Sequence, residues 1–394
     1  MTGRRCSYTK RVAKNETYGM STLRMGTSST FFGDKGHINV SRGVAEFNSQ
    51  RPLIIAAENE RLLALPVEGL DDERLAEFTA LCAPAAPYLV ITSRRALVLG
   101  IDTRTSMAVR LSATNKAKSI LAFVSDSTSD RVPKATPAGR AAAAAIQIAK
   151  LSHGLPAVLA ADLDRHVLTS EHGIITVEAD AAISFFDNAV QSLTLASEAV
   201  VPLNSGSNAR FIVFRDAMGG TEVAIIVGKP DLAKPMPVRL HSACLTGDVF
   251  GSRRCDCGDQ LRLAIARLED LGGGVILYLA QEGRGVGLAN KMRTYRLQDD
   301  GLDTVDANTT LGFDDDERNY GVAARMLNML ECTRVILLTN NPTKLDRLSK
   351  AGIEIVGRMA LEAPINADNR RYMTAKVTRA GHRLGHLGPL GDPS

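Results

Sequence analysis

Short apolar runs alternate with longer segments of helical periodicity along residues 196–394. Two runs, "ARFIVFRD" and "TEVAIIVGK", flank the turn "AMGG" and predict a pair of adjacent strands. Further runs of strand length are "GGVILYLA", "TRVILLTN" and "IEIVGRM". The segments between the runs predict helices over "DQLRLAIARLEDLGG", "GLANKMRTYRLQ", "DDERNYGVAARMLNML" and "NPTKLDRLSKAG". Strands that alternate with helices in this way are typical of an α/β domain.

Two of these helices carry boundary signals. The first stops at Gly272 and has one apolar stripe, made of Leu261, Ile265, Leu268 and Leu271. The last has Asn341 as its predicted N-cap and Pro342 in the first helical position, and Gly352 follows its end. These signals fix where both helices are expected to begin or end.

Residues 34–195 are rich in alanine and have a less regular pattern. Apolar runs that favour strands are "RPLIIAAE", "YLVITSRRALVLGI", "SILAFVSD", "GLPAVLAADL" and "GIITVEAD". Helical patterns cover "DDERLAEFTALCA", on whose apolar face Cys82 is expected to be buried, and "GRAAAAAIQIAKLSHG". A Ser-, Asn- and Gly-rich stretch, "LNSGSNARF", is typical of a connection.

A chain of 394 residues is too long for one ordinary core. We therefore predict an α/β protein with mixed sheets and two domains, residues 34–195 and 196–394. Residues 1–33 form a basic tail rich in Ser and Thr that contains Cys6. Its composition has the character of a transit peptide. The alternative that we favour is a disordered tail or an over-extended start.

Composition excludes several classes of partner. Aromatic residues make up 5% of the chain, Trp is absent and the net charge is +4, so nothing favours a nucleic-acid partner. No apolar run reaches the roughly 18 residues that a membrane span needs, so no membrane partner is expected. Six cysteines in a chain of this length form no disulfide framework. Reduced thiols and a cytoplasmic location are the expectation.

Three of the cysteines, Cys244, Cys255 and Cys257, lie together in "CLTGDVFGSRRCDC". A redox pair would normally be Cys-x-x-Cys, which this stretch lacks. A structural zinc site needs four ligands, and His241 could be the fourth. Three thiolates and one open position are instead the pattern of a catalytic zinc, which lowers the pKa of bound water to about 7. The spacing alone leaves catalytic zinc, structural zinc and no metal as alternatives.

A Gly-rich turn between a predicted strand and a helix, "GGVILYLAQEGRGVGLANKMR", points backbone N–H groups at an anion. Its glycines do not have dinucleotide-fold spacing, and the alternative is a solvated helix start. In "GFDDDERNYG", Asp316 precedes Arg318 by two residues, which by itself is compatible with a surface charge run. Thr339 ends a predicted strand and Lys344 lies in the next helical turn, where α/β sheets bind ligands.

Together these stretches resemble the GTP cyclohydrolase II family over roughly residues 200 to 386. The resemblance is carried by "VRLHSACLTGDVFGSRRCDCGDQL", "QEGRGVGLANKMRTYRLQDDGLDTVDAN", "LGFDDDERNYG", "LLTNNPTKLDRLSKAGI" and "YMTAKVTRAGH". It implies hydrolysis of GTP to 2,5-diamino-6-(5-phosphoribosylamino)pyrimidin-4(3H)-one, formate and diphosphate, the first step of riboflavin biosynthesis. It also implies one Zn²⁺ per subunit, Mg²⁺ with the triphosphate, and a homodimer.

The resemblance assigns residue roles as well. Cys244, Cys255 and Cys257 would hold zinc, Asp316 would accept a proton, and Arg318 would be the nucleophile that takes the guanylyl group. Tyr295 matches the active-site tyrosine of the family. The implied GTP-binding residues are Arg239, Leu240, His241, Ser242, Ala243, Gln260, Glu282, Gly283, Arg284, Thr304, Thr339 and Lys344. Ala243 departs from the family, which usually has Glu immediately before the first zinc ligand.

The first region faintly resembles 3,4-dihydroxy-2-butanone 4-phosphate synthase. The acidic metal-binding loop of that family should follow "RPLIIA", but this chain reads "AENERLLALPVEG", which is several residues shorter. "GRAAA", at Gly139 to Ala143, stands where the family has Gly-Gly-His-Thr-Glu. We expect a domain that keeps the fold without the synthase activity.

Two rival hypotheses remain for the second region. One is an enzyme with altered output, such as a formylated product or a different nucleotide substrate. The other is a nucleotide-binding or regulatory paralogue without catalysis. The second rival is disfavoured because the three cysteines, Asp316 and Arg318 are all present. Analysis of the reaction products would distinguish the first rival from a GTP cyclohydrolase II.

Overall fold

The chain folds into two α/β domains, each built on one mixed seven-stranded sheet, in a computed structural model. The structure describes residues 34–127, 134–163, 173–216, 219–379 and 381. The described residues from Gly36 onward form one compact unit. The tail predicted over residues 1–33 lies outside the described residues, and the limits 34–195 and 196–394 stay predictions.

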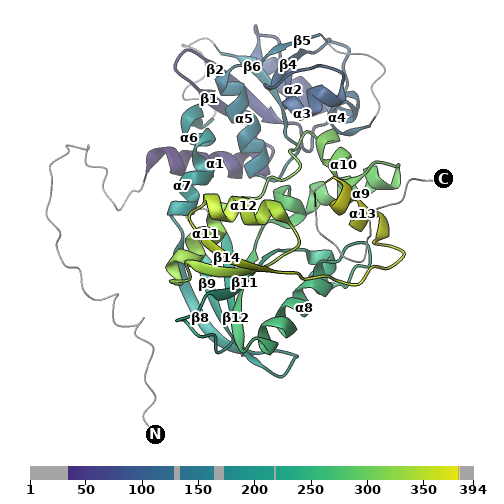
Figure 1. The fold of residues 1–394 in the computed structure, drawn as a ribbon. Helices are drawn as coiled ribbons and strands as arrows, with labels where there is room; N and C mark the ends of the chain where they lie inside the picture. The colour runs from purple at the N-terminus through teal and green to yellow at the C-terminus, as the bar shows by residue number, and fades with distance from the viewer. Residues whose placement is uncertain (1–33, 128–133, 164–172, 217–218, 380, 382–394) are drawn as a thin grey trace, which may run out of the picture. The chain divides into compact units, whose positions relative to one another are not determined.

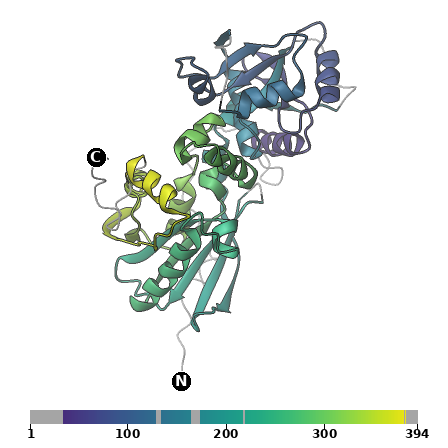
Figure 2. The ribbon, with the colours of Figure 1, turned by 90° about the vertical axis from the view of Figure 1, so that its right-hand side faces the viewer.

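The first sheet has the strand order β5-β4-β3-β6-β2-β1-β7, in which only the β1–β7 pair is parallel. Its strands are β1 (Leu53–Ala56), β2 (Arg61–Pro66), β3 (Tyr88–Ile91), β4 (Met107–Arg110), β5 (Ala135–Pro137), β6 (Ala157–Asp162) and β7 (Thr176–Glu178). The helices of this part are α1 (Lys35–Asn48), α2 (Asp72–Cys82), α3 (Ser93–Val98), α4 (Ala117–Ser125), α5 (Arg140–Leu151), α6 (Ala179–Ile183) and α7 (Phe185–Gln191). Figure 2 shows helices on both faces of this purple-to-blue sheet.

Alternation along the strands divides the first sheet between two apolar clusters. Leu53 and Ile55 of β1 point into the cluster that α1 and α5 cover, whereas Ile54 points into the opposite cluster. Cys82, at the end of α2, is buried in that second cluster, as its position on the apolar face predicted. Both faces of the sheet are therefore covered.

The second sheet has the order β14-β13-β11-β12-β10-β9-β8. The four strands from β14 to β12 are parallel and the others antiparallel. The strands are β8 (Thr194–Pro202), β9 (Asn208–Arg215), β10 (Thr221–Gly228), β11 (Met236–Ser242), β12 (Gly273–Leu279), β13 (Arg334–Leu338) and β14 (Glu354–Met359). The helices are α8 (Cys257–Asp270), α9 (Leu288–Asp299), α10 (Thr304–Thr310), α11 (Tyr320–Met329), α12 (Pro342–Lys350) and α13 (Arg370–Thr378).

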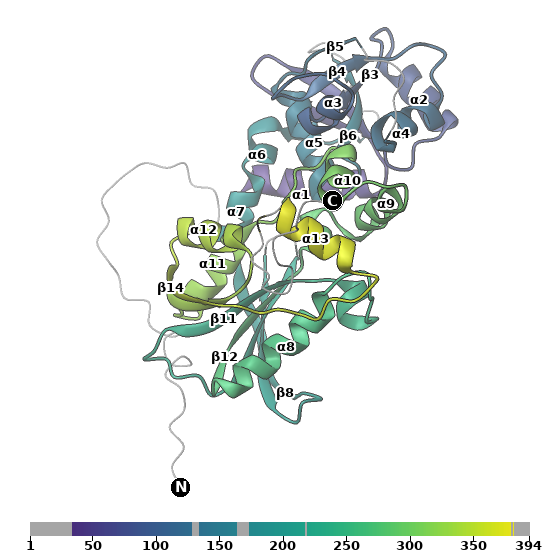
Figure 3. The ribbon, with the colours of Figure 1, turned by 45° about the vertical axis from the view of Figure 1, so that its right-hand side comes forward.

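Figures 1 and 3 show α8 on one side of the second sheet and α11 and α12 on the other. The apolar residues of α8 join one cluster with Ile276, and those of α11 and α12 join another with Val275 and Leu277. Most predicted elements are confirmed, including the antiparallel β9–β10 pair, the N-cap of α12 at Asn341 and the stop of α8 near Gly272. No helix in the described ranges is long and apolar enough to cross a membrane.

Three sequence expectations about elements are wrong. "SILAFVSD" belongs to helix α4 rather than to a strand, because its buried residues Ala117, Ile120 and Val124 recur at helical spacing. "RRALV" likewise lies in helix α3, directly after strand β3. Helix α11 begins at Tyr320 and not in the preceding acidic run, because Asn319 is its N-cap and accepts a hydrogen bond from the Gly321 amide.

Candidate active site

A cavity of ≈ 600 Å³ lies where the parallel strands β11, β12 and β13 end. Carboxyl ends of parallel strands are the usual ligand site of open α/β sheets. The residues that the sequence analysis assigned and that line this cavity are Arg239, His241, Ser242, Ala243, Cys244, Cys255, Cys257, Gln260, Glu282, Gly283, Arg284, Tyr295, Thr304, Asp316, Arg318, Thr339 and Lys344.

Leu240 is the assigned residue whose side chain does not line the cavity. Successive side chains of a strand point to opposite faces, so Leu240 points away from Arg239 and His241 and packs in the apolar cluster under α11. Its backbone carbonyl still takes part in the site, because it accepts a hydrogen bond from Lys344 Nζ at 2.9 Å.

The three cysteines converge although two turns separate them. Cys244 follows β11, Cys257 begins α8, and the three Sγ atoms lie within 4.8 Å of one another. The turn Leu245–Val249 folds over them, and Gly247 permits this, because a Cβ there would come within 2.9 Å of Cys255 Sγ. Cys244 and Cys255 are 3% and 5% exposed and Cys257 is half-buried, so protein encloses two of the three thiols almost completely.

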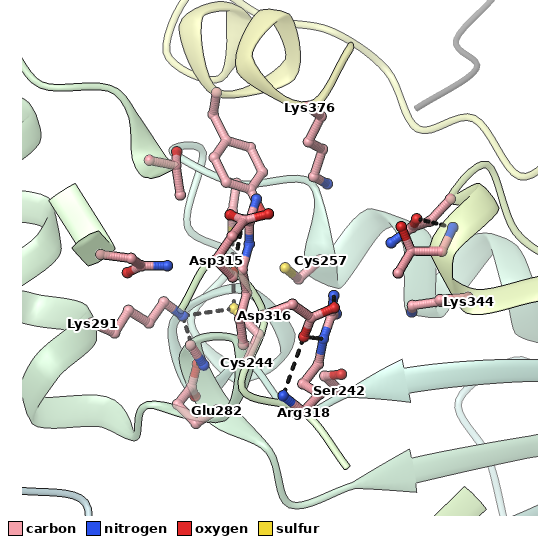
Figure 4. Close-up of a pocket in the computed structure, with 18 of the residues that line it drawn as sticks. Ser242, Cys244, Cys257, Glu282, Lys291, Asp315, Asp316, Arg318, Lys344 and Lys376 are labelled. Atoms are coloured by element: carbon pink, nitrogen blue, oxygen red, sulfur yellow. Dashed lines mark hydrogen bonds and ion pairs between the residues drawn. The ribbon is translucent and has the colours of Figure 1, made fainter. Parts of the chain in front are cut away.

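The thiol arrangement fits a zinc ion. Tetrahedral Zn–S bonds of about 2.3 Å place two sulfurs about 3.8 Å apart, and Cys244 Sγ lies 3.7 Å from Cys255 Sγ. Hydrogen bonds from the other two thiols, together with the nearby Lys291 ammonium, lower the pKa of the Cys244 thiol. Thiolate is the form that binds metal. Lys291 Nζ lies 3.0 Å from Cys244 Sγ and 2.7 Å from Glu282 Oε1, as Figure 4 shows.

A buried acid, Asp248, supports the loop that carries the first cysteine. Its carboxylate accepts from the Cys244 amide at 3.0 Å and from Tyr278 Oη at 2.9 Å, and it lies 3.0 Å from His241 Nε2. Burial lowers the pKa of His241 despite this acid. His241 is therefore tied to Asp248 through Nε2 and does not belong to the thiol cluster.

Asp316 and Arg318 form a two-point ion pair in the cavity (Figure 4). Arg318 Nε lies 2.7 Å from Asp316 Oδ1, and Nη2 lies 2.9 Å from Oδ2. Tyr320 Oη donates to the same carboxylate at 3.1 Å. Burial alone would raise the pKa of Asp316, but the hydrogen bonds and charge of Arg318 outweigh it and lower the pKa to about 2. Both partners are thus charged at neutral pH.

The cavity carries an excess of positive charge. Nine Lys and Arg side chains but four Asp and Glu side chains line it. Lys344 is 7% exposed, and burial together with the neighbouring Arg239 and Arg318 lowers its pKa well below its ordinary value. Burial also lowers the pKa of Arg239, to about 10. Burial and mutual repulsion disfavour the charged forms of these side chains, and a bound anion would offset both effects. The cavity is therefore a strong site for an anion.

The remaining assigned residues lie around this centre. Burial raises the pKa of Tyr295 to about 12, and the Arg254 guanidinium lies 4.5 Å from its ring centroid. Arg284 Nη1 pairs with Asp315 Oδ1 at 2.5 Å. Thr304 accepts a hydrogen bond from Gln298 at 3.0 Å, and Thr339 Oγ1 accepts from the Asn341 amide at 3.1 Å.

Several residues that line or support the cavity were missed by sequence reasoning. Lys376 lies in a quoted stretch, "YMTAKVTRAGH", and pairs with the fully buried Asp256 at 2.5 Å. Asp248 also lay in a quoted stretch, between the first two cysteines, but spacing gave it no role. Arg94 has no signal at all in the sequence, because it reaches the cavity from the first domain.

The fold and the thiol site define an α/β enzyme with a metal-compatible cysteine centre beside an anion pocket. A family model described as GTP cyclohydrolase II matches residues 194–360. "GTP cyclohydrolase-2" of Xylella fastidiosa (strain Temecula1) is 40% identical over 361 residues, which cover 90% of this chain and 89% of that protein. "GTP cyclohydrolase-2" of Azospirillum brasilense is 42% identical over 325 residues, or 79% of this chain and 83% of that protein.

Other similarities cover less or are weaker. "Riboflavin biosynthesis protein RibBA" of Bacillus cytotoxicus is 51% identical over 162 residues, 41% of each chain. The solved structure of RibBX from A. baumannii, "a two domain 3,4-dihydroxy-2-butanone 4-phosphate synthase", covers 82% of this chain and 99% of its own at 14% identity. Its TM-score is 0.32. The relatives matched over most of their length decide the family: this chain belongs to the GTP cyclohydrolase II family of riboflavin biosynthesis.

Proposed function

We propose that the chain hydrolyses GTP to 2,5-diamino-6-(5-phosphoribosylamino)pyrimidin-4(3H)-one, formate and diphosphate with the help of zinc. One observation carries this proposal. The three thiols lie in the same cavity as the Asp316–Arg318 pair and the surplus of cations. A nucleoside triphosphate needs cations for its phosphates, and opening of the guanine imidazole ring needs activated water.

Cys244, Cys255 and Cys257 would hold the zinc ion, which supplies water of pKa about 7 when it is bound. Lys291 orients Cys244 and Glu282 together, because its ammonium contacts both. Glu282 Oε1 accepts hydrogen bonds from Lys291 Nζ and from the Gly283 amide, whereas Oε2 accepts one, from the Leu245 amide. A carboxylate oxygen has two lone pairs, so Glu282 Oε2 can still accept from an N–H group of guanine.

Arg318 would attack the α-phosphorus of GTP and take the guanylyl group while diphosphate leaves. A protonated guanidinium has no lone pair for this attack, and the charged Asp316 next to it raises the pKa of Arg318 against burial. The proton on Arg318 must therefore pass to Asp316 as the N–P bond forms. The two-point contact at 2.7 and 2.9 Å supports this role, because each Asp316 oxygen lies within hydrogen-bond distance of an Arg318 nitrogen. Water later hydrolyses the N–P bond and restores Arg318.

Arg239, Lys344 and Lys376 would bind the triphosphate together with Mg²⁺. Arg239 Nη1 donates to the Leu338 carbonyl at 3.0 Å, but its Nε is buried without a hydrogen-bond partner among the described residues. An unpartnered buried donor in a cationic cavity favours an anionic ligand.

The test is incubation of purified protein with GTP, Zn²⁺ and Mg²⁺, followed by mass analysis of the products. Formate, diphosphate and the pyrimidine in equal amounts support the proposal. A formylated product would favour an enzyme with altered output. Binding of GTP without turnover would favour a regulatory paralogue.

We also propose that the first domain lacks 3,4-dihydroxy-2-butanone 4-phosphate synthase activity. A cavity of ≈ 520 Å³ in this domain has Glu60 and Asp162 in its lining, but both acids have structural partners. Glu60 Oε2 accepts from the Ala141 amide at the start of α5 at 2.9 Å, and Asp162 accepts from Tyr88 Oη at 2.8 Å. Ala141 and Ala142 stand in helix α5 where the synthase family has His and Thr.

A homodimer in the cytoplasm completes the proposal. Free thiols at the metal site require a reducing compartment, which supports the location. Size-exclusion chromatography with light scattering of the zinc-loaded protein measures the oligomeric state.

A further inference from the structure

The segment that leads from α10 to the catalytic pair is packed against the first domain. Leu311 and Phe313 are 2% and 1% exposed, and both lie in the same apolar cluster as residues of β3 and α3. Gly312, between them, has φ +91°, and a Cβ there would meet Thr92 Oγ1 at 2.9 Å. The close approach of the two segments at this point therefore requires glycine.

Buried polar contacts fix the same segment. Thr92 Oγ1 donates to the Gly312 carbonyl at 2.7 Å, and Arg95 Nη1 donates to the Thr310 carbonyl at 2.7 Å. Arg95 is 2% exposed and also donates to the Phe123 carbonyl of the first domain. Separation of the domains would break both of these hydrogen bonds.

A further contact between the first domain and this segment is made by Lys150, at the end of α5. Its Nζ lies 2.6 Å from Glu317 Oε1, and the two side chains are 17% and 18% exposed. Glu317 stands between Asp316 and Arg318 in the chain. Its Oε1 also accepts from the Asp314 amide at 2.8 Å, and its own amide donates to the Arg284 carbonyl at 3.1 Å. One glutamate thus links the first domain to both sides of the catalytic segment.

We propose that the first domain holds residues 310–317 in the catalytic conformation and that Lys150 is a positioning residue for Asp316 and Arg318. This inference rests on the proposed function of the second domain. It gives the first domain a role that needs no chemistry of its own. Lys150 does not line the substrate cavity, so its effect must pass through Glu317.

The test uses the full chain with Lys150→Met, with Lys150→Arg as the conservative variant. Lys118→Met is the matched control, because Lys118 is exposed on α4 of the same domain. A misplacement of about 1 Å costs about 100-fold in rate, so we expect Lys150→Met to lower kcat about 10- to 100-fold. KM for GTP and zinc content should stay at wild-type values, and Lys150→Arg should recover most of kcat. A wild-type kcat for Lys150→Met would overturn the proposal.

Hydrogen exchange of the amides of residues 314–318 gives a readout that does not depend on turnover. Lys150→Met should speed exchange of the Glu317 amide relative to wild type and to Lys118→Met, because its bond to the Arg284 carbonyl loses support. Reduced kcat without faster exchange would contradict positioning through Glu317. Faster exchange in a protein whose wild type releases no formate would uphold the positioning contact and reject the proposed reaction instead.

Discussion

Glu222 offers a prediction about stability whose sign and size follow from its surroundings. It lies on β10, is 8% exposed, and accepts a hydrogen bond from the Ala280 amide at 2.7 Å. Burial raises the pKa of this carboxyl from 4.5 to about 7, with a smaller contribution from the charge of Asp216, whereas the Ala280 hydrogen bond opposes the shift. The folded chain therefore keeps a proton that the unfolded chain has already lost.

The direction follows from proton linkage. Between pH 4.5 and about 7 the native state binds more protons at this site than the unfolded state, so the free energy of unfolding falls as pH rises. The contribution is complete below pH 4.5 and is lost once pH passes about 7. At about 1.36 kcal/mol per pKa unit, a shift from 4.5 to about 7 corresponds to roughly 3 kcal/mol.

Glu222→Gln removes the ionisation and keeps a carbonyl oxygen for the Ala280 amide. We expect the variant to match wild type near pH 4.5 and to be more stable by roughly 3 kcal/mol at pH 8. Urea unfolding followed by far-ultraviolet circular dichroism at several pH values measures this difference. Other titrating groups are common to both proteins, so the difference isolates Glu222.

Glu198→Gln is the matched control, because the Glu198 side chain is 44% exposed and pairs with Arg210 on the neighbouring strand. Its stability difference from wild type should not change across the same pH range. If the difference between Glu222→Gln and wild type is also independent of pH, the reasoning about a buried protonated carboxyl is refuted.

Three further predictions concern the proposed chemistry. Cys255→Ser should lose bound zinc, measured by metal analysis, and formate release, while circular dichroism stays close to wild type; zinc at wild-type stoichiometry would reject the ligand assignment. Arg318→Ala should lose diphosphate release as well as ring opening, whereas Cys255→Ser should keep part of its diphosphate release; equal diphosphate output from Arg318→Ala and wild type would exclude the nucleophile. The chain should form no dihydroxybutanone phosphate from ribulose 5-phosphate with Mg²⁺. If expression of this chain restores growth of a strain that lacks the synthase, that prediction is rejected.

The sequence predicted most of the second domain because its periodicity is unambiguous. Helix α8 and strand β12 are long. The apolar stripe of α8 fits a helical period, and the continuous buried run of β12 fits a strand. Short apolar segments such as α4 gave the wrong element, because burial on one side looks alike in a short helix and a short strand. Strand β8 was missed for the opposite reason: all nine of its residues are exposed, so it has no apolar alternation to detect.

The site was predictable where its residues are close in sequence or belong to a long motif. The three cysteines lie within one stretch, and their convergence needed only Gly247 to let the turn close over them. Asp248 and Lys376 were not assigned, because their roles depend on partners 30 and 120 residues away. Contacts across such distances are set by tertiary packing, which periodicity and spacing do not record.

The parts of the cavity differ in how much of the chain is needed to hold them in place. The thiols rest on β11, α8 and the turn between them, all within the second domain. Asp316 and Arg318 lie outside any helix or strand and depend on support from two directions. On one side the 282–285 turn packs closely on the Glu317 backbone at Gly285, where a Cβ would lie 2.9 Å from the Glu317 carbonyl group. On the other side Lys150 binds the Glu317 carboxylate. Zinc binding is therefore expected to be a property of one domain, whereas guanylyl transfer by Arg318 depends on both.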